Sequence, residues 1–192
     1  MKYRLVNSKI TDNYARRLLE ERGVTDYYNF LNPESYMVTD PILLDNIEKG
    51  ADLLLNIINK PNHKIILIVD CDVDGFTSST ILWQYLHELN QDVNISYEIH
   101  SGKQHGLEDI FERIEVMSEL PDLIILPDAG SNDYEYHAKL KDIGVTTLVL
   151  DHHEAENVSN KAIIINNQLS SNYSNKALTG AGVTWQFCRS IS

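Results

Sequence analysis

The sequence has few cysteines and no long hydrophobic run. Only Cys71 and Cys188 occur, in unlike contexts, which excludes a disulfide framework and a paired-cysteine zinc site. The N-terminal stretch MKYRLVNSKITDNYARRLLEERG is charged throughout and lacks an apolar signal core, and no later run is as long as a membrane span. We therefore expect a soluble, cytoplasmic protein with reduced thiols and no membrane contact.

Positive charge is also scarce. The 192 residues include 28 acidic and 16 basic side chains, which gives a net charge of −12. This balance argues against a broad basic surface that coats nucleic acid, so metal ions or a local patch must supply the positive charge at any bound phosphate. Hydrophobic residues make up 43% of the chain, too many for a disordered acidic protein and enough for one core with an N-terminal annex.

The hydrophobic pattern changes once along the chain. Apolar side chains at helical spacing in 11–22 and 40–59 predict a helical N-terminal segment over residues 1–61. From residue 62 to residue 192, short apolar runs alternate with helical segments, which predicts an α/β domain with a parallel sheet and helices on both faces. The predicted strands are 65–69, 93–99, 123–126, 146–150 and 162–165, and the predicted helices lie near 77–89, 107–118 and 133–142 and begin again near 179.

Three of the predicted strands are followed by aspartate. The residues concerned are Asp70, Asp72 and Asp74 after the first strand, Asp128 after the third, and Asp151, His152 and His153 after the fourth. Because the carboxyl ends of parallel strands meet at one edge, these side chains would converge and repel one another unless cations lay between them. Such ligands suit manganese or magnesium, with zinc, cobalt or iron as alternatives. Two ions sharing a carboxylate form the clamp used for in-line attack on phosphorus.

Other interpretations of these carboxylates are open to test. A single aspartate after a strand is often a helix cap, which is an equal alternative for Asp128 taken alone. The run Asp70-x-Asp72-x-Asp74 resembles the start of a calcium-binding EF-hand loop, but that loop needs glutamate at its twelfth position, where this chain has Ile81. Glycine-triplet and P-loop nucleotide motifs are absent.

Several ordered segments resemble the DHH phosphoesterase superfamily, and within it the RecJ-type single-strand-specific exonucleases. They are IILIVDCDVDGFTSSTIL, DLIILPDAGSND, TLVLDHHEAEN and NNQLSSNYSNKALTGAGVTWQF, preceded by a helical lead-in similar to that of RecJ proteins. The resemblance implies an enzyme that uses two Mn²⁺ or Mg²⁺ ions to activate water and hydrolyse single-stranded DNA, from its 5′ end, in repair or recombination. Replication or repair proteins would be its partners.

The resemblance also implies roles for individual residues. Asp70, Asp72 and Asp74 would bind metal, Asp128 would bridge the ions, and His152 would be a ligand of one ion. His153 and Asp151 would be the catalytic pair beside them, with His153 facing the scissile phosphate.

A glycine segment follows the last predicted strand. Gly180, Ala181 and Gly182 suit either a tight strand-to-helix connection or a phosphate-binding helix N-terminus. His105 lies where the family often has a glycine-rich turn, and Lys103 would replace the arginine usual shortly before it.

The chain also departs from the family. RecJ-like enzymes have a further metal-binding aspartate downstream of the glycine segment and then a substrate-binding domain, and this sequence has neither. We therefore expect a fragment of a longer protein, with a naturally short relative as the alternative. Two other functions stay open, a DHH enzyme acting on short oligonucleotides, cyclic dinucleotides or pyrophosphate, and a non-catalytic binding module.

Overall fold

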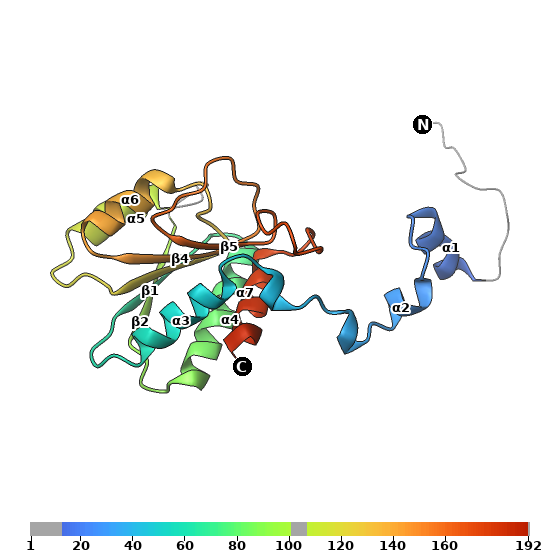
Figure 1. Cartoon of the computed structure of the whole chain (residues 1–192), viewed down its shortest axis with the longest axis horizontal. Helices are drawn as coiled ribbons and strands as arrows, with labels where there is room; N and C mark the ends of the chain where they lie inside the picture. Colours follow the sequence, from blue (N-terminus) through green and yellow to red (C-terminus); the bar gives the residue numbers. More distant parts are fainter. Residues whose placement is uncertain (1–12, 101–106, 192) are drawn as a thin grey trace. The chain divides into compact units, whose positions relative to one another are not determined.

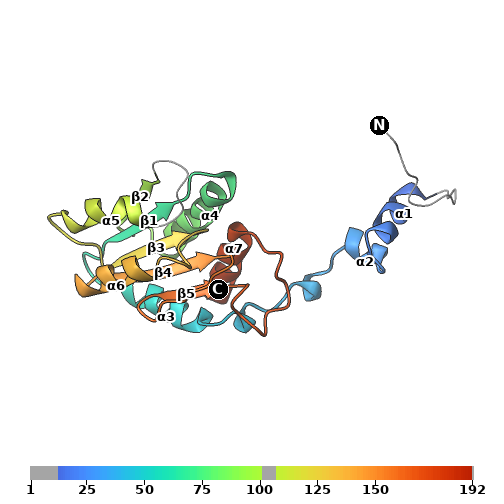
Figure 2. The same ribbon diagram turned by 90° about the horizontal axis from the view of Figure 1, so that it is seen from above.

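A five-stranded parallel sheet forms the centre of the protein in the computed structural model, which describes residues 13–100 and 107–191. The order of the strands is β2-β1-β3-β4-β5, and each pair of neighbours is parallel (Figures 1 and 2). The strands are β1 (Ile65–Val69), β2 (Ile95–Ile99), β3 (Leu123–Pro127), β4 (Thr146–Asp151) and β5 (Ile163–Asn166). The predicted α/β class and parallel sheet are confirmed.

Helices cover both faces of this sheet because its central strands are apolar on both sides. All five residues of β1 and of β3 are buried, and alternate residues of each strand point to opposite cores. One core lies under α3 (Ile47–Ile58), α4 (Val73–Leu89) and α7 (Gly180–Ile191), and the other lies under α5 (Glu108–Glu115) and α6 (Tyr134–Asp142) (Figure 1). No helix in the described ranges 13–100 and 107–191 is long and apolar enough to span a membrane.

The N-terminal part of the chain divides differently from the predicted boundary. Contacts separate a unit Met1–Thr39 from a unit Asp40–Ser192. The short helix η2 (Pro41–Leu43) and α3 therefore belong with the sheet, because apolar side chains of α3 such as Leu54 are fully buried in its core. The predicted boundary at 61/62 marks the approach to the first strand and not a division between compact units.

The first unit is helical, as its apolar spacing predicts. Its described part contains α1 (Tyr14–Glu21), α2 (Tyr27–Leu31) and the short 3-10 helix η1 (Ser35–Met37), and none of the three has a buried side chain. The side chains of Asn13 and Asp26 cap α1 and α2 by accepting hydrogen bonds from backbone N–H groups. Capping and spacing, both local signals, account for these helices.

One buried histidine gives the fold a testable response to acid. His137 on α6 is fully buried, and neither ring nitrogen has a hydrogen-bond partner among the described residues. Burial lowers its pKa from 6.5 to about 4, so only the unfolded chain takes up a proton between these values. Stability is therefore expected to fall by about 3 kcal/mol as the pH drops from 6.5 to 4. In H137L, urea unfolding at pH 7.5 and pH 5 should show a smaller fall, and the same fall in both proteins would contradict this account.

Candidate metal centre

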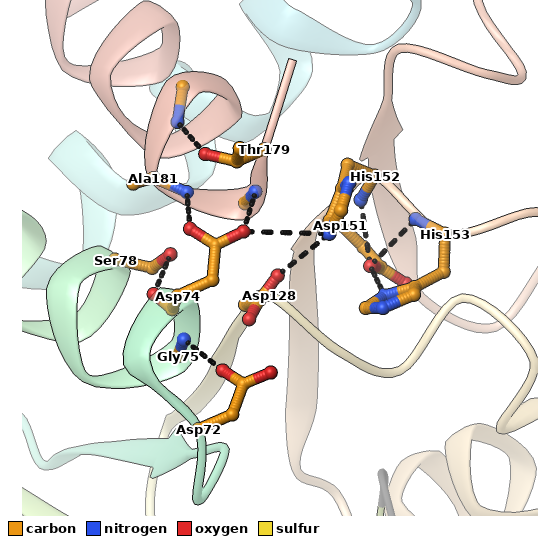
Figure 3. Close-up of polar contacts among 12 residues, drawn as sticks. Asp72, Asp74, Gly75, Ser78, Asp128, Asp151, His152, His153, Thr179 and Ala181 are labelled. Carbon is orange, nitrogen blue, oxygen red and sulfur yellow. Dashed lines mark hydrogen bonds and ion pairs between the residues drawn. The ribbon is translucent and has the colours of Figure 1, made fainter. Parts of the chain in front are cut away.

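The carboxyl ends of β1, β3 and β4 bring the predicted aspartates and histidines to one edge of the sheet (Figure 3). Ligand atoms of Asp70, Asp72 and Asp128 lie within 4.8 Å of one another, and so do those of Asp128, His152 and His153. The two groups share Asp128. The edge can therefore hold metal on both sides of one carboxylate, the arrangement predicted for a bridging ligand.

Asp72 and Asp74 lie at the start of α4, next to this edge of the sheet. Asp72 is the N-cap of the helix, and its Oδ1 accepts a hydrogen bond from the backbone N–H of Gly75 at 2.8 Å. The carboxylate of Asp74, two residues on, reaches the start of α7, where it accepts hydrogen bonds from the N–H groups of Gly180 at 2.8 Å and Ala181 at 2.9 Å. Asp72 thus caps its own helix, while Asp74 connects α4 to α7.

Asp128 occupies the centre of the site. Its backbone has a φ of 77°, a left-handed conformation uncommon for residues other than glycine, and its side chain is buried. Neither carboxylate oxygen has a hydrogen-bond partner among residues 13–100 and 107–191. His152 Nε2 lies 3.2 Å from Asp128 Oδ1 and 3.5 Å from Asp74 Oδ2, close enough for ion pairing but outside hydrogen-bond geometry for Asp128.

The surroundings of Asp128 oppose its ionisation. Burial, followed by the neighbouring carboxylates of Asp74 and Asp72, raises its pKa from 3.8 to about 8. A buried carboxylate without hydrogen bonds is costly unless a cation lies against it. Carboxylates and one imidazole around an unsatisfied carboxylate are the ligands of a divalent metal site, so the residues present fit such an ion.

Asp151 has a different environment and holds the histidine pair. Its Oδ1 accepts hydrogen bonds from the backbone N–H groups of His152 and His153 and contacts His153 Nδ1 at 2.8 Å, while its Oδ2 accepts one from the Ser131 N–H at 3.0 Å. Burial alone would raise the pKa of Asp151, but hydrogen bonds from His153 and Ser131 outweigh it and lower the pKa to about 2. The hydrogen bond to Asp151 in turn raises the pKa of His153 to about 9, so an anionic carboxylate holds a cationic imidazole.

Comparison with known proteins agrees with this geometry. Residues 64–191 match the model of the DHH family, N-terminal domain. The chain belongs to the DHH family. The protein YorK from the SPbeta prophage of Bacillus subtilis (strain 168), provisionally named a single-strand DNA-specific exonuclease, is 45% identical over 193 residues, which cover 100% of this chain and 32% of YorK.

RecJ proteins are more distant relatives of this DHH domain. The single-stranded-DNA-specific exonuclease RecJ of Bacillus subtilis is 26% identical over 165 residues, 84% of this chain and 21% of that protein. Among solved structures, RecJ from Thermus thermophilus in complex with Mn²⁺ superposes with a TM-score of 0.71 at 23% identity, over 90% of this chain and 24% of that one. The chain thus has a RecJ-like DHH fold and spans about a third of the length of YorK.

The glycine segment has a structural role in this DHH domain. The N–H groups of Gly180 and Ala181 donate to Asp74, whereas a phosphate was the acceptor in one of the two roles predicted for this segment. Gly180 is required by close approach, since a Cβ atom there would lie 2.6 Å from the Cβ of Asp128. The glycine therefore allows α7 to begin directly against the candidate metal ligand. Phosphate binding by Gly180, Ala181 and Gly182 stays a prediction.

This contact predicts different effects of alanine at two neighbouring glycines. G180A is expected to push Asp128 aside and to weaken Mn²⁺ binding about 10- to 100-fold, a loss typical of disturbed groups around a metal. G182A is the matched control, because its nearest neighbours are side-chain atoms of Leu178, from 3.0 Å, which can move. Calorimetric titration with Mn²⁺ measures both. Equal affinity in G180A and G182A would contradict the role given to Gly180.

Two polar residues of the site escaped the sequence prediction. Asn166, at the end of β5, donates hydrogen bonds from Nδ2 to Ser131 Oγ at 2.8 Å and to the carbonyl oxygen of His153 at 2.9 Å. Asn166 is 1% exposed and Ser131 also 1%, so the bond between them is buried, while the bond to His153 is partly buried. The sequence did place Asn166 directly after a predicted strand, where the other site residues lie. Its amide side chain, unlike a carboxylate or an imidazole, gave no reason to predict it as a site residue.

The remaining predicted residues have less support. Lys103 and His105 lie outside the described residues, so the structure gives no account of their predicted substrate contacts. Cys71, in the connection between β1 and α4, is exposed.

Proposed function

We propose that this chain is the metal-binding domain of a phosphodiesterase that hydrolyses single-stranded DNA with two divalent ions, Mn²⁺ or Mg²⁺, in the 5′ to 3′ direction. The observation that carries the proposal is the buried Asp128 carboxylate, which accepts no hydrogen bond from the described residues and lies between the acidic start of α4 and His152. A cytoplasmic setting, suited to a sequence with only two cysteines, and a role in DNA repair or recombination belong to the same proposal.

The described residues divide into two ligand groups. Asp70, Asp72 and Asp128 would hold one ion, and Asp128 and His152 the other, with Asp74 beside them. Divalent ions bound by these residues would lower the pKa of water to near neutrality, neutralise charge on a phosphate in transfer and offset the net charge of −12 at the site.

The histidine pair supplies the protein's own part of the chemistry. His153 is held by the buried Asp151 and has a pKa raised to about 9, so it carries a proton at neutral pH. A protonated imidazole at this edge would donate a hydrogen bond to an oxygen of the scissile phosphate and offset its growing charge. Asp151 orients the ring, the Ser131 N–H donates to Asp151, and Asn166 links the loop that carries Ser131 to the one that carries His153.

The substrate is proposed from the relatives YorK and RecJ, whose names both refer to single-stranded DNA. The test is degradation of single strands labelled at the 5′ or the 3′ end, and of the matching duplex, by the whole protein with Mn²⁺ or with EDTA. We expect nucleotide release from the 5′ end of single strands with Mn²⁺ and none with EDTA. His152→Ala should lower turnover about 100-fold, with an unchanged circular dichroism spectrum.

Other outcomes assign other functions. Turnover on dinucleotides, cyclic dinucleotides or pyrophosphate but not on long strands would replace the exonuclease with a small-substrate DHH enzyme. Absence of both turnover and calorimetric Mn²⁺ binding would indicate a non-catalytic binding module. Full activity in His152→Ala would contradict the proposed metal centre.

A further inference from the structure

An apolar groove lies between α4 and the edge strand β2, outside the ligand groups of the metal centre. Its volume is about 330 Å³, within the range of roughly 300–1,000 Å³ that is typical of ligand pockets. Three aromatic side chains line it, Phe76, Trp83 and Tyr97, together with the hydroxyl-bearing Ser79 and Thr80 and aliphatic residues of β1 and β2. None of the described side chains that line it is charged.

The groove is open because β2 is the edge strand of the sheet (Figure 2). Leu67 and Tyr97 are partners in the register of β1 and β2, but Leu67 is 1% exposed whereas Tyr97 is 58% exposed. Phe76, on the facing side of α4, is 47% exposed. Two large aromatic rings are thus half in solvent on either side of one groove.

The groove begins at the metal centre. Asp72, Phe76 and Thr80 are spaced four residues apart along the start of α4, so they lie one turn below another on the same side of the helix. Val69, which also lines the groove, immediately precedes Asp70. A DNA strand whose phosphate lies at the metal centre would therefore have its neighbouring bases within reach of the groove.

We propose that this groove binds unpaired nucleobases of the strand whose phosphate lies at the metal centre, an inference that rests on the proposed function. Aromatic side chains stack on any base, so the lining suits a DNA single strand without selecting its sequence. The uncharged lining also lets an acidic protein hold DNA through its bases and not its phosphates. A base must leave its duplex stack to enter, which favours single strands.

The test compares exposed aromatic residues inside and outside the groove, in the whole protein. Phe76→Gln and Tyr97→Thr remove rings from the groove, and Tyr134→Gln, on α6 at the other face of the sheet and 46% exposed, is the matched control. The probes are fluorescein-labelled oligothymidylate and an abasic strand of the same length, which carry the same phosphates. Binding is measured in EDTA, and bis(p-nitrophenyl) phosphate with Mn²⁺ reports on the metal centre alone.

Each groove variant is expected to bind oligothymidylate about tenfold more weakly than the wild type and to raise the KM for single strands similarly. Binding of the abasic strand, turnover of bis(p-nitrophenyl) phosphate and the behaviour of Tyr134→Gln should stay unchanged. Unchanged oligothymidylate affinity in Phe76→Gln and Tyr97→Thr would overturn the proposal, and so would equal losses for both DNA strands.

A changed oligomeric state with unchanged affinity for the DNA strand would assign the groove to a protein contact instead. If the wild type fails to hydrolyse any probe, the proposed function fails, while the comparison of the two strands still decides the groove.

Discussion

Replacing Asp128 with asparagine is expected to abolish hydrolysis and to stabilise the metal-free protein. The variant loses the carboxylate shared by both ligand groups, so turnover should fall by about 1,000-fold or more. The same carboxylate is buried, accepts no hydrogen bond from the described residues and has a pKa raised to about 8. At pH 7, well above the usual carboxyl pKa of 3.8, folding must therefore protonate it or bury its charge. An amide removes this cost of about 4 kcal/mol and tolerates the left-handed backbone.

Thermal unfolding in EDTA and hydrolysis with Mn²⁺ measure the two effects of this substitution. Asp52→Asn, the same chemical change at an exposed position of α3, is the matched control and should alter neither. The stability gain of Asp128→Asn should grow as the pH rises from 4 to 8, because the wild-type cost grows over that range. A less stable Asp128→Asn, or one that retains activity, would show that Asp128 is a structural residue.

Asp151→Asn is expected to reduce turnover by about 100- to 10,000-fold while leaving Mn²⁺ binding largely intact, since general acid–base and charge-stabilising groups contribute in this range. Each oxygen of Asp151 accepts hydrogen bonds. An amide nitrogen in place of one oxygen would therefore face a donor, either the backbone N–H of Ser131 or the backbone N–H and Nδ1 of His153. His153 would lose the partner that mainly raises its pKa. It would then be largely neutral at neutral pH.

The pH profile of hydrolysis tests this role of Asp151. A raised histidine pKa means that the protonated form persists as the pH rises and is lost only near pH 9, so wild-type activity should decline above about that pH. In Asp151→Asn the decline should move toward the ordinary histidine value of 6.5. Mn²⁺ calorimetry is the control for an intact site. A pH profile identical to that of the wild type would assign Asp151 a purely structural role.

The positions of the strands could be predicted from the sequence with small errors. β1 has its predicted bounds, and β3 and β4 each extend one residue beyond theirs. The largest error is in β2, which begins at Ile95 and not at Val93. Val93 is buried, but its N–H donates to the carbonyl oxygen of Asn90 in the preceding turn. A buried apolar residue in a turn has the same sequence pattern as one in a strand, so the pattern alone placed the boundary too early.

The acidic edge of the site could also be predicted, because its residues follow the strands directly. Their individual environments could not. Asp74 and Asp72 are two residues apart, yet Asp72 accepts a hydrogen bond from its own helix and Asp74 from the start of α7, more than 100 residues away. Asp128 and Asp151 both follow or end buried strands, yet within the described part of the chain only Asp151 of this pair has hydrogen-bond donors around its carboxylate.

The sequence by itself determined the family, the α/β class, the approximate strands and the set of carboxylates and imidazoles at their ends. These are local features, since burial on both faces, helical spacing and the triplet Asp151-His152-His153 are each contained in a short segment. The tertiary structure alone decided that Asp128 is central and without hydrogen bonds from the described residues, that Gly180 makes room for it, and that Asn166 joins two loops. These relations depend on the order β2-β1-β3-β4-β5, which brings distant strand ends together and which no local pattern specifies.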